Sequence, residues 1–287
     1  MGSETRLIHA SARRLQGTVQ LRPYTCDETE VVEGGVMTIV SHMNWVDFEE
    51  QQKNIDTVLI PFGAVEVYGP HLPMGADGIA TSALAREVAE RVPAFVAPLI
   101  PVGFSESLAS FPGTLSVTPE SLVGYARDVS ESFIRWGCKR ILFINGHAGN
   151  VPYLAELARQ LEHAYDVRCA QIDWWRFIQP MVEDLVESDI LPHGHASEFG
   201  TSVMLHLSPN DVKLDRALRT APEVSNAFPD FLRSRTYRAL TSTGILGDAT
   251  KGSAEKGAEV MRRAVQRTVD FLESDEFTVP GSSSIPK

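Results

Sequence analysis

Short apolar segments that alternate with segments of helical spacing constrain the fold of this chain more than any other feature. The apolar segments span 57–63, 95–102, 139–146 and 167–172, and the segments with helical spacing span 79–92, 119–136, 151–164 and 253–272. A further segment, 197–207, is compatible with a helix. Strands that are apolar throughout are typical of a parallel sheet with both faces covered by helices. The pattern therefore predicts an α/β fold, a three-layer α/β/α sandwich with a mostly parallel central sheet.

The domain boundaries follow from where this alternation begins and ends. The chain has 287 residues, enough for one large α/β domain with a substantial core. The first residues show no clear period, so we expect an N-terminal extension or arm over 1–35 and a single domain over 36–275. The last residues are rich in serine, glycine and proline, and we expect a flexible tail over 276–287.

Charge and cysteine content narrow the class of partner. The net charge is −11, from 26 basic and 37 acidic residues, which disfavours binding to nucleic acid. No apolar run approaches the roughly 18 residues that a membrane span needs. The three cysteines, Cys26, Cys138 and Cys169, lack the paired spacing of a zinc–thiolate site or a disulfide framework. We therefore expect a cytoplasmic protein that acts on a small-molecule substrate.

Polar side chains gather where the predicted strands end. Ligands bind at the carboxyl ends of strands in such sheets, and these ends are followed here by Glu66, Asp77, Ser105, His147 and the pair Trp174-Trp175. Carboxylates and imidazoles are ligands for divalent ions, which lower the pKa of a bound water from about 15.7 toward about 7. Glu66, Asp77, His147 and Glu198 are of the right types, and we expect them to bind metal.

Spacing alone leaves other roles open for these four residues. Asp77 could cap the helix that follows it. His147 could hydrogen-bond the backbone at a strand end. Glu198 could be a first-turn carboxylate that interacts favourably with a helix dipole.

Five segments, in order along the chain, resemble motifs of the creatininase family. Glu66-Val-Tyr-Gly-Pro-His-Leu-Pro-Met-Gly-Ala-Asp77 resembles E-x-H-G-P-H-L-P-x-x-T-D, and Phe111-Pro-Gly-Thr-Leu-Ser116 resembles F-P-G-T-x-S. Asn145-Gly-His-Ala-Gly-Asn150 is similar to N-G-H-G-G-N, and His195-Ala-Ser-Glu-Phe-Gly-Thr-Ser202 to H-A-G-E-x-E-T-S. Segment 247–257 is similar to G-D-P-x-x-A-x-x-E-K-G. Five ordered matches identify a divergent member of that family.

The resemblance implies a creatininase-like fold and one or two divalent ions, Zn²⁺ first, with Mn²⁺ or Fe²⁺ as alternatives. It implies that Glu66 and His147 bind one ion, that Asp77 bridges two, and that Glu198 serves the second. His195 would be the acid/base or substrate-polarising group, with Glu198 as an alternative proton donor to the leaving nitrogen. It also implies a homo-oligomer, often a hexamer.

We further expect a group of substrate-binding residues around the metal. One of Trp174 and Trp175 should line the pocket while the other packs in the core. His71 could orient a ligand, and Tyr68 could bind substrate, ligate weakly or act as a gate. Backbone donors at Gly113 and Thr114 could stabilise an oxyanion. These expected substrate-binding residues are Tyr68, His71, Gly113, Thr114, Trp174 and Trp175.

The chain departs from the family pattern where a second ion would bind. Tyr68 replaces the motif's second-metal histidine, and a phenol is a poor ligand unless it is ionised. Gly149 stands where creatininase itself has a glutamate ligand, Gly200 replaces a second glutamate, and Ala76 replaces a threonine. These changes predict an altered or missing second metal site and make creatinine a doubtful substrate.

The function that these observations predict is a metal-dependent amidohydrolase. Metal-activated water would cleave a C–N bond, other than a peptide bond, in a cyclic or linear amide or a formamide. A metal-dependent lyase, cyclase or peptidase of a biosynthetic pathway is an alternative on the same fold. A non-catalytic metal-binding protein is the third hypothesis, and the four retained ligand types argue against it.

Overall fold

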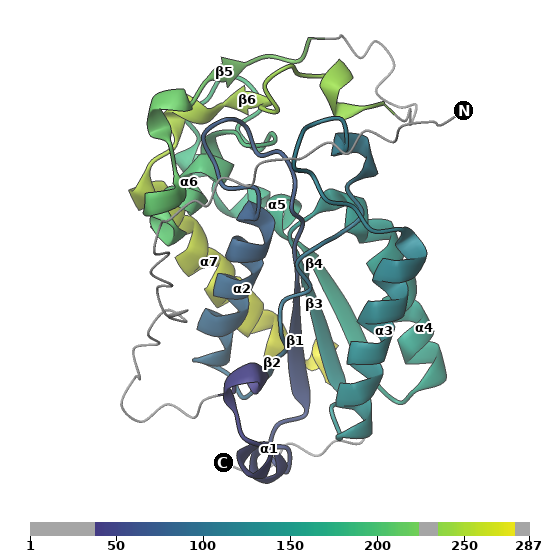
Figure 1. Ribbon diagram of the computed structural model, residues 1–287. Helices are drawn as coiled ribbons and strands as arrows, with labels where there is room; N and C mark the ends of the chain where they lie inside the picture. Colours follow the sequence, from purple (N-terminus) through teal and green to yellow (C-terminus); the bar gives the residue numbers. More distant parts are fainter. Residues whose placement is uncertain (1–37, 224–234, 279–287) are drawn as a thin grey trace, which may run out of the picture. The chain divides into compact units, whose positions relative to one another are not determined.

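A four-stranded parallel sheet forms the centre of the computed structural model, which describes residues 38–223 and 235–278. The strands are β1 (Thr57–Phe62), β2 (Phe95–Val96), β3 (Arg140–Asn145) and β4 (Arg168–Asp173), in the spatial order β2-β1-β3-β4. β1 pairs with β3 over six residues, and β3 pairs with β4 over six more. Their carboxyl ends therefore lie at one edge of the sheet (Figure 1).

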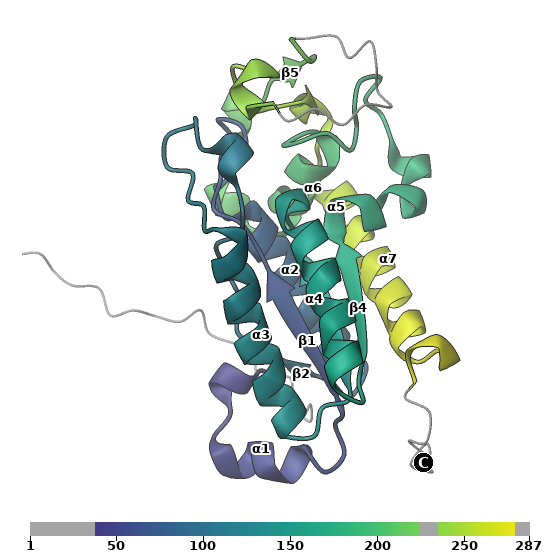
Figure 2. The same ribbon diagram turned by 90° about the vertical axis from the view of Figure 1, so that its right-hand side faces the viewer.

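Helices cover both faces of this sheet (Figures 1 and 2). One layer contains α2 (Ala76–Ala89) and α7 (Ala254–Leu272), and α6 (Glu198–Leu207) packs against both of these helices. The opposite layer contains α3 (Pro119–Arg135) and α4 (Val151–Ala164). The three-layer α/β/α architecture predicted from the sequence is thus confirmed.

Alternation along the strands divides the core in two. Successive side chains of a strand point to opposite faces. On β3, Leu142 and Ile144 pack into the cluster that contains α2 and α7, whereas Ile141 and Phe143 pack into the cluster that contains α3 and α4. Both sets are buried. This is why the strand is apolar at every position instead of at every second one.

Local capping fixes the ends of the long helices. The side chain of Thr118 accepts a hydrogen bond from the backbone N–H of Ser121 at 3.2 Å, and Pro119 occupies the first turn of α3. Ser253 caps α7 in the same way through the N–H of Lys256 at 3.3 Å.

Several boundaries differ from the sequence-based expectation. The strand expected over 95–102 pairs regularly only over Phe95–Val96, because Pro98 has no N–H for the ladder, and it returns as a single bridge between Phe62 and Ile100. Helix α2 begins at Ala76, three residues earlier than predicted. Two short helices, α1 (Trp45–Gln51) and α5 (Trp174–Phe177), and the small antiparallel pair β5 (Arg219–Thr220) and β6 (Gly247–Asp248) were not predicted.

The last described residues pack against the domain. Phe277, within the segment 276–287 that was expected to be a flexible tail, is buried, and its ring centroid lies 4.8 Å from that of Phe271. The arm expected over 1–35 and the rest of the tail, 279–287, lie outside the described residues. Within the described ranges, no helix combines the length and apolar character that crossing a membrane requires.

Candidate metal centre

Three separate segments bring Glu66, Asp77 and His147 together at the carboxyl edge of the sheet. Glu66 follows β1, Asp77 lies in the first turn of α2, and His147 follows β3. Each residue offers one ligand atom, and these three atoms all lie within 4.8 Å of one another. All three side chains are buried. Two carboxylates and one imidazole form a donor set that suits a hydrolytic divalent ion.

The orientation of His147 indicates which of its nitrogens is free for a metal. Its Nε2 lies 2.9 Å from the carbonyl oxygen of Phe104, which can only accept a hydrogen bond, so Nε2 carries the proton. Its Nδ1 lies 3.0 Å from Oε2 of Glu66 and 3.7 Å from Oδ2 of Asp77. In the metal-free site Nδ1 therefore faces both carboxylates, and once it has lost its proton its lone pair would point between them. This arrangement, with the other nitrogen held by a carbonyl, is typical of a metal-binding histidine.

The charges of this group are strongly coupled when no ion is bound. Burial alone would raise the pKa of Glu66, but hydrogen bonds to His147 and His195 outweigh it and hold the pKa at about 2. Burial, together with the negative charge of Glu66, raises the pKa of Asp77 to about 7. Burial would lower the pKa of His147, but the hydrogen bond and charge of Glu66 raise it to about 9. The metal-free site thus holds a proton on His147 at neutral pH.

Neighbouring donors hold the two carboxylates in place. The hydroxyl of Ser105 donates to Oε2 of Glu66 at 2.7 Å, and the indole Nε1 of Trp175 donates to Oδ1 of Asp77 at 2.9 Å. Gly146 lets the loop after β3 approach α2, because a Cβ there would lie 2.8 Å from both Cβ and the carbonyl oxygen of Asp77. The ligand geometry therefore depends on packing as well as on the ligands themselves.

His195 lies on the other side of Glu66. Its Nδ1 lies 2.9 Å from the carbonyl oxygen of Gly244 and therefore carries a proton, while its Nε2 lies 3.2 Å from Oε1 of Glu66. Its ring packs against Tyr68 and Tyr237, with centroid separations of 4.5 and 4.8 Å. Anchored through Nδ1, the imidazole presents Nε2 to the centre, where this nitrogen can accept or release a proton.

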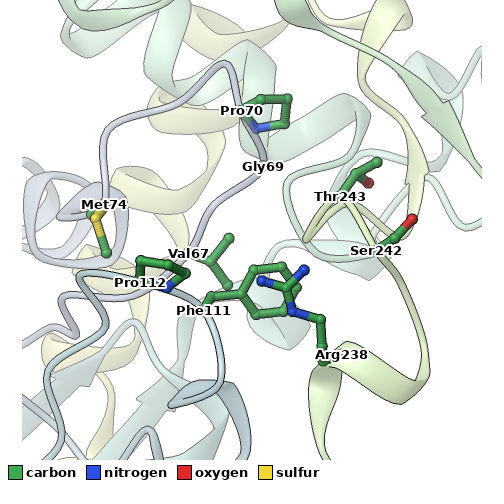
Figure 3. A pocket seen from close by; sticks show the side chains of 9 residues that line it. All are labelled: Val67, Gly69, Pro70, Met74, Phe111, Pro112, Arg238, Ser242 and Thr243. Atoms are coloured by element: carbon green, nitrogen blue, oxygen red, sulfur yellow. The ribbon is translucent and has the colours of Figure 1, made fainter.

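A pocket opens beside the loop that carries Glu66 (Figure 3). Its volume is about 380 Å³, and it is lined by Val67, Gly69, Pro70, Met74, Phe111, Pro112, Arg238, Ser242 and Thr243. The guanidinium of Arg238 lies over the ring of Phe111, 4.2 Å from its centroid. Within the described ranges, no carboxylate pairs with Arg238. The pocket therefore combines an apolar floor with one cation that has no acidic partner there.

Comparison with known proteins identifies the family. The creatininase family model, described as creatinine amidohydrolase, matches residues 41–272, which is most of the chain.

The chain belongs to the creatininase family.

Relatives of known function differ in what they hydrolyse. The chain is 30% identical over 256 residues to the creatinine amidohydrolase of Pseudomonas putida, covering 82% of this chain and 96% of the relative. It is 34% identical over 226 residues to the mycofactocin precursor peptide peptidase of Mycolicibacterium smegmatis, covering 76% of this chain and 85% of the relative. Family membership therefore does not select one substrate.

Solved creatininase structures share the fold and carry different metals. A manganese form of creatininase superposes with a TM-score of 0.71, and a mutant creatininase of the Zn–Zn type with a TM-score of 0.73. Each is 27% identical to this chain, and each comparison covers 84% of this chain and 98% of the solved one. These structures support a divalent ion in this family member without deciding which one.

The structure separates Glu198 from the other three expected ligands. Its carboxylate is completely buried, accepts hydrogen bonds from the backbone N–H of Glu187 and Ser188, and pairs with the ammonium of Lys256 at 2.5 Å. It does not belong to the group that converges on one point. Because Lys256 already neutralises this carboxylate, Glu198 fits a structural ion pair between α6 and α7. Glu198 is therefore neither one of the proposed metal ligands nor the proposed acid/base group.

The two tryptophans have divided roles, as the sequence suggested for the pair. Trp174 is completely buried in the core cluster and cannot line a pocket, so that part of the substrate-binding prediction is wrong. Trp175 holds Asp77 by its hydrogen bond and lies 5.9 Å from the ring of Tyr68. Trp175, one of the two residues expected to line the pocket, thus orients the carboxylate of Asp77.

Two more of the expected substrate contacts, His71 and Thr114, form hydrogen bonds within the protein. His71 is buried, its Nε2 bonds the hydroxyl of Thr201 at 2.8 Å, and burial lowers its pKa to about 4. The N–H of Thr114 donates to the carbonyl of Phe111 at 3.3 Å, so it is not free for an oxyanion. The hydroxyl of Thr114 accepts from the N–H of Val67 at 3.2 Å and thereby holds the segment that carries Glu66.

Gly113 forms the turn beside the pocket. Its φ of +87° lies in the left-handed region, and a Cβ there would lie 3.0 Å from the sulfur of Met74. The F-P-G-T segment thus shapes the pocket through Phe111 and Pro112, its two residues in the lining.

Several residues that shape the candidate centre or its pocket were not assigned a role from the sequence. Ser105 follows the second predicted strand, so its position was a usable signal. Lys256 falls in the segment that resembles E-K-G, but nothing local shows that its partner is Glu198. Tyr237 and Arg238 lie outside all five segments that resemble family motifs, so no motif marks them.

Proposed function

We propose that this creatininase-family protein hydrolyses the C–N bond of an amide in a small molecule, with a divalent ion held by Glu66, Asp77 and His147. The observation that carries this proposal is the position of Nδ1 of His147, which lies 3.0 Å from a buried oxygen of Glu66 and 3.7 Å from a buried oxygen of Asp77. Zn²⁺ is the first candidate, with Mn²⁺ or Fe²⁺ as alternatives. We also propose a homo-oligomer, which light scattering on the purified protein would test.

The residues of this chain would divide the work around that ion. A bound divalent ion polarises a carbonyl group and lowers the pKa of a water molecule. Ser105 and Trp175 keep the carboxylates fixed by their hydrogen bonds. His195, anchored to the carbonyl of Gly244, would accept a proton at Nε2 and return it to the leaving nitrogen.

The pocket of Figure 3 supports a substrate that carries an acidic group. Its volume of about 380 Å³ suits a small molecule or the end of a peptide. Arg238 has no acidic partner among the residues described, and a guanidinium binds a carboxylate through paired, charge-assisted hydrogen bonds. We propose that Arg238 binds a carboxylate of the substrate.

Peptide hydrolysis is a second candidate, favoured by the 34% identity to a mycofactocin precursor peptide peptidase. A free peptide C-terminus would offer Arg238 the same carboxylate as an acidic small molecule. The two candidates can be separated by assaying creatinine alongside N-formyl amino acids and short peptides, the last two each with a free or an amidated carboxyl group. Oxygen-18 from water entering the product would show hydrolysis and exclude a lyase or cyclase.

Metal depletion tests the proposal directly. Chelator-treated protein should lose hydrolysis of its best substrate and regain it on addition of Zn²⁺ or Mn²⁺. His147→Asn should lose both metal and activity. His163→Asn, which changes an exposed histidine at the end of α4, should lose neither. Full activity in metal-depleted wild-type protein would refute the proposal.

A further inference from the structure

Tyr68 is buried beside the candidate centre, with 3% of its surface exposed. Its ring contacts the rings of Trp175 and His195, with centroid separations of 5.9 and 4.5 Å. A bulky neutral group therefore fills the position where the related motif has a histidine.

The two oxygens of Asp77 face different partners. Oδ2 faces Nδ1 of His147 at 3.7 Å, on the side of the proposed ion. Oδ1 accepts the indole N–H of Trp175 at 2.9 Å. A carboxylate that bridges two cations offers one oxygen to each. Here the indole N–H of Trp175 already occupies Oδ1, which leaves the carboxylate suited to a single ion.

The other two positions where the family pattern offers acidic side chains hold glycine, and the surroundings leave them little room. A Cβ at Gly200 would lie 3.3 Å from Cε1 of Tyr68, so the tyrosine ring takes space that a larger residue on α6 would need. A Cβ at Gly149 would lie 2.3 Å from the carbonyl oxygen of Phe104 and 2.5 Å from Nε2 of His147. Neither position can supply a carboxylate without displacing its neighbours.

Other potential ligands in the described ranges do not replace the missing histidine and glutamates of a second metal site. Over the described ranges, the one group of three or more acidic, histidine or cysteine side chains that converges tightly enough for an ion is Glu66, Asp77 and His147. Glu198, the remaining acid of the resembling motif, is neutralised by Lys256.

We propose that this protein binds one divalent ion per chain and that the ring of Tyr68, packed against Gly200, excludes a second. The inference rests on the proposed function, since it presupposes that an ion binds at Glu66, Asp77 and His147. It makes Tyr68 a residue that determines metal stoichiometry, in contrast to the Zn–Zn type known for a creatininase.

Metal counting tests this without any substrate. Metal-depleted full-length protein is saturated with Mn²⁺ or Zn²⁺ and desalted, and metal per chain is measured by plasma mass spectrometry. Wild-type protein should hold one ion, and Mn²⁺ bound to it should show the electron paramagnetic resonance spectrum of an isolated ion. Two ions per chain, or a spin-coupled pair, would overturn the inference and leave the proposed function intact. No bound ion would refute the proposed function itself.

Matched variants test the role assigned to Tyr68. Tyr68→Phe keeps the ring and should still hold one ion. The double variant Y68H/G200E restores both ligand types of the related motif and should hold two. Tyr68→Ala opens the same space without adding a ligand and serves as a second test if the double variant does not fold by circular dichroism. If Y68H/G200E folds and still binds one ion, or if Tyr68→Phe binds two, Tyr68 is not what excludes the second ion.

Discussion

Metal affinity at the candidate centre should rise steeply with pH, because protons compete for its ligands. Without an ion, the pKa of His147 is raised to about 9 and that of Asp77 to about 7, while Glu66, with a pKa near about 2, is already charged. An ion needs a neutral imidazole and charged carboxylates. Each proton that the free site holds must therefore leave when the metal binds.

The sign and size of the effect follow from these pKa values. His147 is protonated below about pH 9, so the apparent affinity should rise about tenfold per pH unit between about pH 7 and about pH 9. That is about 100-fold, or about 2.7 kcal/mol at about 1.36 kcal/mol per unit. Below about pH 7 Asp77 is also protonated, so the metal must displace a second proton. The apparent affinity should therefore change more steeply with pH there. Above about pH 9 the affinity should level off.

Two measurements check this. Competition with a coloured chelator gives Zn²⁺ affinity across the pH range, and calorimetry in buffers of different ionisation enthalpy counts released protons. About one proton should be released at about pH 8. In metal-free protein, the NMR titration of His147 should give a pKa well above the ordinary value, and Glu66→Gln should bring it down. The exposed-site variant His163→Asn should match wild type throughout.

A flat affinity between about pH 7 and about pH 9, with no proton released at about pH 8, would refute this reasoning. It would mean that the pair of His147 and Glu66 is not the protonated ion pair that their 3.0 Å separation and burial imply.

Three further predictions concern packing and recognition. Gly146→Ala places a Cβ 2.8 Å from Asp77 and should cost about 1–3 kcal/mol of stability, together with metal content, measured by urea unfolding and metal analysis. Lys256→Met leaves Glu198 buried without its cation and should cost about 3–5 kcal/mol in the same unfolding assay. Arg238→Gln should raise KM about tenfold for substrates with a carboxylate, a loss of about 1.4 kcal/mol, while metal content and kcat for their amides stay unchanged.

Exposed residues of the same type provide the controls. Lys251→Met and Arg216→Gln change side chains at the surface and should leave stability and KM near wild type. Lys256→Met with wild-type stability would show that Glu198 does not depend on this cation. An equal rise in KM for acids and amides in Arg238→Gln would contradict the proposed contact between Arg238 and a substrate carboxylate.

Much of the fold could be predicted because its signals are local. The apolar runs of β1 and β3 and the helical spacing of α4 depend on neighbours a few residues away, and their bounds came out within about a residue. The strand over 95–102 was overpredicted because one proline breaks the ladder. The two short helices, α1 and α5, carry too little periodic pattern to be recognised.

The sequence alone determined the kinds of residue at the candidate centre. It also placed Glu66, Asp77 and His147 after the carboxyl ends of predicted parallel strands. Only the tertiary structure decided which acids meet: Lys256, far along the chain, pairs with Glu198 and removes it from the site. It also decided that Trp175 and not Trp174 reaches Asp77. Period and motif describe local order, whereas ligation depends on which side chains from distant segments share one buried volume, and that is fixed by packing.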